Sequence, residues 1–150
     1  MSIYRRRVET IRALVAGSVV ARNAPMYGLI DQELQEVYNV VRVPQLHRRR
    51  LLQVLHTTRS LDSGLAEFVR YHQLPHPGRS LGQYLTALSR NNAHTLLAPL
   101  PGGARARYQV SIVNVRNRYM HEAGAFPATD GEIMTLLSEM DACLVQVLSL

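Results

Sequence analysis

An arginine, an asparagine and a histidine lie close together in one strongly helical segment, residues 115–124. Arg116 precedes His121 by five residues, and Asn117 follows Arg116 directly. A histidine can accept or donate a proton near neutral pH, and an arginine is a permanent cation whose planar guanidinium binds phosphate. This pair of side chains could therefore cleave a phosphodiester bond of RNA without a metal ion.

The helical periodicity of this segment places Arg116 on an apolar face. At about 100° per residue, Arg116 falls in the middle of the arc that holds the apolar side chains, whereas Arg118 points toward water. Because an unpaired guanidinium in apolar surroundings is costly, Arg116 needs a partner. That partner is either a phosphate supplied by a ligand or a carboxylate of the chain itself, such as Glu33, Glu36 or Glu139.

Asn117 and His121 are one helical turn apart, so they are predicted to lie side by side at the edge of the same arc. His121 is about 140° from Arg116 on an ideal helix. The two side chains converge only if the long arginine reaches around, if the helix loosens near Gly124, or if a second copy of the chain contributes one of them. A histidine at a helix end can also serve only as a partner of the helix dipole.

The charge of the chain favours a polyanionic partner. All 17 basic residues are arginines, and the net charge is +6, which is typical of proteins that bind nucleic acid. Codon bias in a GC-rich genome would explain the missing lysine without any ligand. Arg48, Arg49 and Arg50 begin a predicted helix and could bind an RNA backbone, with a solvated helix face as the alternative. The lone Cys143 lies in an apolar stripe and is expected to be buried.

The sequence predicts no metal site, no cofactor and no membrane partner. His72 and His76 flank a proline-containing loop, but no cysteine or carboxylate stands at ligand spacing. No glycine-rich phosphate loop follows a strand. No apolar run approaches the roughly 18 residues that span a bilayer, and no apolar signal segment follows the arginines at 5–7. We therefore expect a cytoplasmic protein.

Apolar periodicity predicts helices throughout and no convincing strand. The expected helices carry their apolar residues within 3–19, 30–41, 51–68, 81–88 and 133–148, and the segment with Arg116 is a further helix between loops at 98–103 and 126–127. Pro44 is expected in the first turn of the third helix, which residues 63–64 could interrupt. Capping boxes open the helices after Ser80 and Thr129.

The length and the hydrophobic content of 47% indicate one domain, residues 1–150. We expect an all-α bundle of about four main helices plus a short extra helix.

The sequence VRNRYMH at residues 115–121 resembles the Arg-polar-x3-His signature of the HEPN superfamily. These are the α-helical nucleotide-binding and ribonuclease domains of bacterial toxins, phage-defence systems and RNA-processing enzymes. The architecture is also similar, because the family is a small helical bundle with this motif late in the chain, before a final helix. One toxin type in the family has a tyrosine two residues after the histidine, where this chain has Ala123.

The resemblance implies a metal-independent endoribonuclease, a hydrolase that works as a homodimer with both motifs lining one cleft. His121 would act as general base or acid on a ribose 2'-hydroxyl, and Arg116 would stabilise the charge of the transition state. Asn117 would orient the histidine or the phosphate. The implied products are a 2',3'-cyclic phosphate and a 5'-hydroxyl. The implied setting is toxin-antitoxin or phage-defence biology, where an antitoxin or a defence protein would be a further partner.

Two other functions fit the same residues. The first is a non-catalytic helical dimerisation or adaptor module, in which Arg116 is a buried structural ion-pair partner. The second is a basic nucleic-acid binder that cleaves nothing. They differ in what the loss of Arg116 would do: destabilise the fold in the first case, and weaken only the affinity for nucleic acid in the second.

Overall fold

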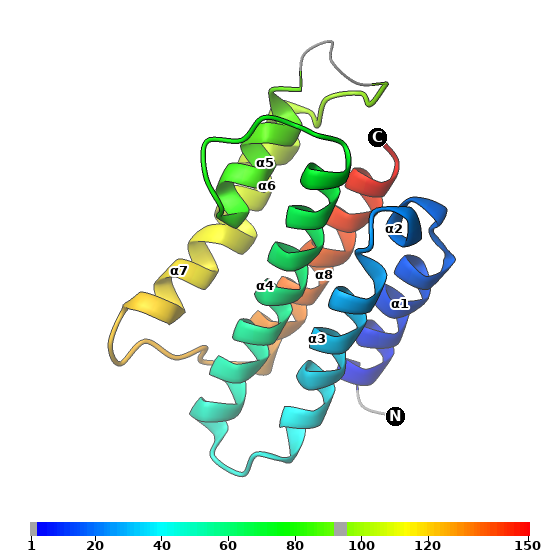
Figure 1. The fold of residues 1–150 in the computed structure, drawn as a ribbon. Coiled ribbons are helices and arrows are strands. Elements are labelled where there is room, and N and C mark those ends of the chain that lie inside the picture. Colours follow the sequence, from blue (N-terminus) through cyan, green and yellow to red (C-terminus); the bar gives the residue numbers. More distant parts are fainter. Residues whose placement is uncertain (1–2, 92–95) are drawn as a thin grey trace.

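The computed structural model describes residues 3–91 and 96–150 of the chain. In these residues every regular element is a helix, so the predicted all-α class is confirmed (Figure 1). The long helices are α1 (Ile3–Gly17), α3 (Tyr27–Asn39), α4 (Leu46–Tyr71) and α8 (Asp130–Leu148). The short elements are α2 (Val19–Asn23), the 3-10 helix η1 (Val40–Arg42), α5 (Leu81–Ser89), α6 (Gly102–Tyr108), the π-helix η2 (Gln109–Val113) and α7 (Asn114–His121).

The long helices enclose the core because each carries one apolar stripe. In Figure 1, α3 packs against α1 and α4, and α8 lies behind α4 and against α1. The stripes meet in a continuous cluster of buried side chains, among them Ile11, Ile30, Leu61, Leu65 and Leu137. Burial of one such side chain stabilises the fold by roughly 1.5–3 kcal/mol. Cys143 is also fully buried, as predicted.

Gly64 allows α3 and α4 to approach each other closely. A Cβ atom built at this position would lie 2.7 Å from Cδ1 of Ile30. The expected interruption at residues 63–64 is therefore absent, and α4 runs without a break from Leu46 to Tyr71. The glycine is explained by packing between two helices rather than by a turn.

Two helix starts agree with the capping boxes in the sequence, and two other helix boundaries differ from the prediction. The Oγ1 atom of Thr129 accepts a hydrogen bond from the Glu132 amide at 3.3 Å, and Ser80 caps α5 in the same way. Both predicted capping boxes are thus present as N-caps. Two other boundaries were predicted wrongly. Ser18 ends α1 and caps the separate helix α2, and α4 begins at Leu46 instead of including Pro44 in its first turn.

The segment that carries Arg116 is helical, but it is divided into α6, the π-helix η2 and α7. A π-helix is rare and is often found at functional sites. Across η2 the buried and exposed positions still follow the helical periodicity that the sequence predicts. Ile112 and Tyr119 are buried, whereas Val110 and Asn114 are exposed. The segment lies beside α4 and α5 (Figure 1).

Candidate functional site

Arg116 lies in the first turn of α7 and is half-buried, whereas Arg118 is exposed, as the periodicity predicts. The Nη1 atom of Arg116 donates a hydrogen bond to Oδ1 of the adjacent Asn117 at 3.3 Å. Within the part of the chain that the structure describes, Arg116 forms no ion pair.

The carboxylates expected as internal partners of Arg116 have other partners. Glu33 lies 2.8 Å from Nδ1 of His56 and 3.1 Å from Nη2 of Arg59. Glu36 accepts a hydrogen bond from Asn39. Glu139 binds Arg107 at 2.7 Å and Ser111 at 2.8 Å, and the hydrogen bond from Arg107 lowers the pKa of the Glu139 carboxyl. None of these three acids is in contact with Arg116.

A pocket of about 310 Å³ lies between the first turn of α5 and the start of α7. Its polar lining consists of Ser80, Gln83, Thr86, Gln109, Arg116 and Asn117. Among the described residues of this lining, Arg116 is the only charged one, and the other polar groups are amides and hydroxyls. One cation among neutral hydrogen-bonding groups suits an anionic oxygen group such as a phosphate. We call this cavity the Arg116 pocket.

Gly82 brings α5 directly onto the π-helix and so forms one wall of the Arg116 pocket. A Cβ atom at Gly82 would lie 3.1 Å from Oε1 of Gln109 and 3.6 Å from Cγ1 of Val113. The Gln109 side chain is held by a hydrogen bond from its Nε2 to Oδ1 of Asn114 at 2.9 Å. The amide of Gln109 is therefore fixed in orientation at the edge of the pocket.

His121 is the last residue of α7 and is exposed. It is not part of the lining of the Arg116 pocket, which contains Arg116 and Asn117. Gly124, with a φ of 79°, turns the chain away after the helix end. The structure therefore brings Arg116 and Asn117 together and leaves His121 at a separate position on the same helix.

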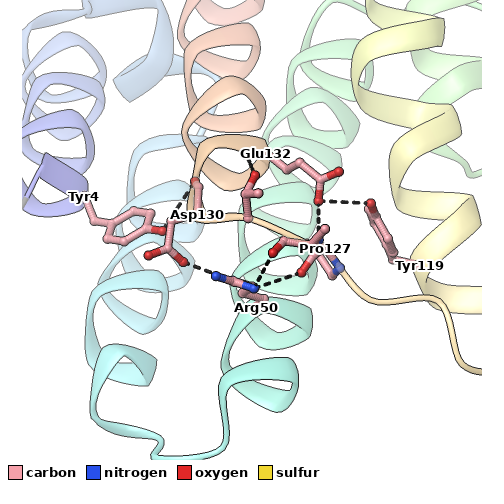
Figure 2. A network of polar contacts seen from close by, with 8 residues as sticks. Tyr4, Arg50, Tyr119, Pro127, Asp130 and Glu132 are labelled. Atoms are coloured by element: carbon pink, nitrogen blue, oxygen red, sulfur yellow. Dashed lines mark hydrogen bonds and ion pairs between the residues drawn. The ribbon is translucent and has the colours of Figure 1, made fainter.

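The three arginines at the start of α4 have different surroundings. Arg48 is exposed and Arg49 is half-buried, whereas the Arg50 side chain is only 11% exposed. Arg50 donates from Nε to Asp130 at 3.0 Å and from Nη1 to the carbonyl oxygens of Ala128 at 2.7 Å and Pro127 at 3.3 Å (Figure 2). Arg50 thus holds the chain that enters α8.

The same network continues to α1 and α7, as Figure 2 shows. The Tyr4 hydroxyl donates to the Asp130 carbonyl oxygen at 3.4 Å, and the Tyr119 hydroxyl donates to Glu132 at 3.3 Å. Desolvation alone would raise the pKa of the Asp130 carboxyl. The hydrogen bond from Arg50 and the positive charge of Arg50 lower this pKa, and the net result is a pKa below the ordinary value. The sequence indicated only the cap at Thr129, because the other partners are distant in the chain.

Asp62 on α4 is a polar residue of this region that no sequence motif indicated. Burial raises the pKa of its carboxyl, and the charge of Arg116 opposes that shift. The Oδ1 atom of Asp62 is fully buried and has no hydrogen-bond partner. A lone aspartate in an amphipathic helix resembles any solvated polar residue, so the effect of Arg116 on its pKa could not be predicted from spacing.

Comparison with known proteins adds nothing to what the fold and the candidate site show about the class of protein. No protein-family model, no curated protein and no solved structure matches the chain. Among the described helices none is both long and apolar enough to cross a membrane, and residues 3–91 and 96–150 contain no cluster of three potential metal ligands. The described residues therefore form an all-α fold with a polar pocket, and a single arginine is found in the described lining of that pocket.

Proposed function

We propose that the protein is a metal-independent endoribonuclease of the HEPN type that acts as a homodimer in a toxin-antitoxin or phage-defence setting. The observation that supports this proposal best is the state of Arg116. It is half-buried, and among the described residues it contacts no carboxylate and lines a pocket whose other polar groups are uncharged. A guanidinium in such surroundings is available for a phosphate of the RNA backbone.

In the proposed reaction, His121 takes the proton from a ribose 2'-hydroxyl, and the 2'-oxygen attacks the neighbouring phosphorus. The bond from phosphorus to the 5'-oxygen breaks, and that oxygen takes up a proton, which leaves a 2',3'-cyclic phosphate and a 5'-hydroxyl. Arg116 stabilises the extra negative charge on the phosphorane-like transition state. Asn117, which accepts a hydrogen bond from Arg116, helps to orient the guanidinium.

The contribution of Arg48 and Arg49 to RNA binding is part of the same proposal. Arg48 is exposed, and Arg49 keeps part of its side chain accessible, so both can contact phosphates and release counterions. The guanidinium of Arg50 is largely occupied by Asp130 and two carbonyl groups. We therefore assign the affinity for the RNA backbone to Arg48 and Arg49 before Arg50.

The proposal is tested by RNA cleavage in excess EDTA. We expect wild type to cleave and Arg116→Ala and His121→Ala to be inactive, because removal of a charge-stabilising or proton-transferring group costs orders of magnitude in rate. Arg118→Ala is the matched control, since Arg118 is exposed, pairs with Glu122 at 3.6 Å at the surface and lies over the ring of Tyr119, outside the lining of the Arg116 pocket. A 2'-deoxy substitution at the cleaved nucleotide should abolish cleavage. Wild-type activity that requires a metal, or that survives Arg116→Ala, would contradict the proposal.

The homodimer makes a second experiment possible. Mixing inactive Arg116→Ala with inactive His121→Ala produces mixed dimers in which one site combines Arg116 of one copy with His121 of the other. If the two residues act across the dimer, random exchange should restore about a quarter of the wild-type activity. No recovery, in a preparation shown to exchange subunits, would mean that each copy uses its own pair or that no dimer site exists.

A further inference from the structure

A second cavity adjoins the Arg116 pocket, and the proposed reaction assigns it no role. Its volume is about 410 Å³, and Thr86 of α5 lines both cavities. Its other polar lining consists of His76, Arg90 and Asn91, and the described residues of the lining include no acid. A guanidinium and an imidazole without a carboxylate suit an anionic group, whereas a metal cation would need several donor ligands around it. We call this cavity the His76 pocket.

His76 is held in one orientation in the loop between α4 and α5 (Figure 1). Its Nδ1 atom lies 2.7 Å from the carbonyl oxygen of Gly78. Because a carbonyl oxygen only accepts, Nδ1 carries the hydrogen and donates it. The His76 ring also meets the Tyr84 ring edge-on, with the two ring centroids 5.6 Å apart. Nε2 is thus the ring nitrogen that remains for a ligand, and no hydrogen bond within the described residues occupies it.

The loop that carries His76 is packed onto a wall of the Arg116 pocket. A Cβ atom added at Gly78 would overlap the side-chain amide of Gln83, so the backbone of the loop lies directly against this amide. Gln83 itself lines the Arg116 pocket. The two cavities are therefore joined through this contact as well as through the threonine that lines both.

Arg90 follows the last residue of α5 and supplies the second cation of this surface. It is exposed, and within the described residues it forms no ion pair. It lies about one helical turn after Thr86, which is about 6 Å along the helix axis. One nucleotide of an extended single strand spans a similar distance. Arg116 and Arg90 thus stand at the two ends of one polar surface that passes Thr86, and a basic surface of this kind can follow a nucleic-acid backbone.

We propose that the His76 pocket is a second phosphate site, in which Arg90 and Nε2 of His76 bind a phosphate next to the one that Arg116 binds. A single strand of RNA then runs along α5 and past Thr86. The inference rests on the proposed function, which supplies the RNA and the first phosphate. Arg90 donates from its guanidinium, and the protonated form of His76 donates from Nε2, so each of the two phosphates meets a cation. The second contact fixes the register of the strand and leaves the chemical step unchanged.

Binding of a single-stranded 2'-O-methyl RNA tests the inference, because such an RNA has no 2'-hydroxyl and cannot be cleaved. Arg90→Ala should lower the affinity by about 5- to 20-fold and reduce the slope of log affinity against log salt by about 0.7, the value for one phosphate of a single strand. Arg79→Ala is the matched control, since Arg79 is exposed in the same loop and lines neither cavity. Equal losses in the two variants would mean a diffuse effect of charge and would overturn the inference.

The length of the RNA shows whether the two sites hold one strand. In wild type the affinity should rise from a dinucleotide, which has one internal phosphate, to a tetranucleotide, which has three. In Arg90→Ala most of this gain should be lost, because the second phosphate then has no arginine to bind. The same gain in both proteins would overturn the inference.

His76→Asn tests the histidine without removing its structural hydrogen bond. The asparagine amide can donate to the Gly78 carbonyl oxygen as Nδ1 does, but it has no group at the position of Nε2. We expect the affinity for the same RNA to fall by about 2- to 10-fold at slightly acidic pH, with an unchanged Tm. In wild type, the NMR signals of the His76 ring should shift when this RNA is added. Full affinity of His76→Asn, or ring signals that stay in place, would overturn the inference.

Cleavage kinetics separate the inference from the proposed function. If wild type cleaves RNA, Arg90→Ala should raise KM and keep kcat within about twofold, because it removes binding that is equal in the ground state and the transition state. An unchanged KM would overturn the inference alone. If wild type binds the 2'-O-methyl RNA through Arg116 and Arg90 but cleaves no RNA, the proposed reaction is overturned and the second phosphate site is confirmed.

Discussion

Replacing Arg50 with alanine should destabilise the protein, whereas replacing the neighbouring Arg48 should not. The Arg50 side chain is 11% exposed and donates hydrogen bonds to Asp130 and to the carbonyl oxygens of Pro127 and Ala128 (Figure 2). Arg48 is exposed and makes no such contact among the described residues. The two variants remove the same charge, so any difference in stability reports the network and not the net charge.

The magnitude follows from the contacts that Arg50 loses. The ion pair with Asp130 is partly solvated, because the Asp130 side chain is 50% exposed, and such a pair contributes up to about 1 kcal/mol. Each hydrogen bond to a backbone carbonyl contributes about 0.5–1.5 kcal/mol net. Arg50→Ala should therefore lower the free energy of unfolding by about 1–4 kcal/mol, and Arg48→Ala by less than about 0.5 kcal/mol.

The assay is urea unfolding followed by circular dichroism at neutral pH, repeated in acid. With a slope of about 1–3 kcal/mol per molar urea, the midpoint of Arg50→Ala should fall clearly below that of Arg48→Ala. The folded-state pKa of Asp130 is lowered. Its contribution is therefore complete above its ordinary pKa and is lost as the pH falls through the lowered value. The difference between wild type and Arg50→Ala should shrink in acid, and equal midpoints for both variants at neutral pH would refute the reasoning.

Two further predictions concern the packing of α3 on α4 and the stability in acid. Gly64→Ala should destabilise by about 1–3 kcal/mol, because the new methyl group would meet Ile30 at 2.7 Å. Gly28→Ala should be neutral or stabilising by up to about 1 kcal/mol, because nothing lies within 4 Å of its added atom; thermal unfolding of the pair checks both. The hydrogen bond from Arg107 lowers the pKa of Glu139, so this acid stabilises at neutral pH and less as the pH falls. Glu139→Gln should therefore give a shallower loss of stability in acid, and an unchanged slope would contradict this.

The features that the sequence predicted are those that depend on neighbours within one helical turn. The apolar stripe of α8 and its cap at Thr129 lie entirely within residues 129–148, and both are present. The buried Cys143 follows from the same stripe. The side-chain cap that starts α2 at Ser18 is also local, but the apolar periodicity continues past it, so the break between α1 and α2 was missed.

The features that the sequence did not predict depend on residues that are far apart in the chain. Arg50 and Asp130 are separated by 80 positions, and no local pattern distinguishes Arg50 from Arg48 or Arg49. The charge of Arg116 acts on Asp62 only because α4 packs against α7. The Arg116 pocket likewise requires α5 to lie on the π-helix, and Gly82 permits that approach. In the sequence, Gly82 looks like any other residue of a capping box, because nothing there shows that the π-helix lies against it.

The arrangement of α7 bears on how Arg116 and His121 could act together. The wheel places them about 140° apart, and the structure keeps α7 helical through His121, with Arg116 bonded to Asn117 and lining the pocket beside α5. The helix end does not loosen before the histidine, and the described lining of the Arg116 pocket does not include His121. We therefore propose that joint action of the two residues depends on a second copy of the chain. For this reason, recovery of activity in mixed dimers is a stronger test of the proposal than the loss of activity in either variant alone.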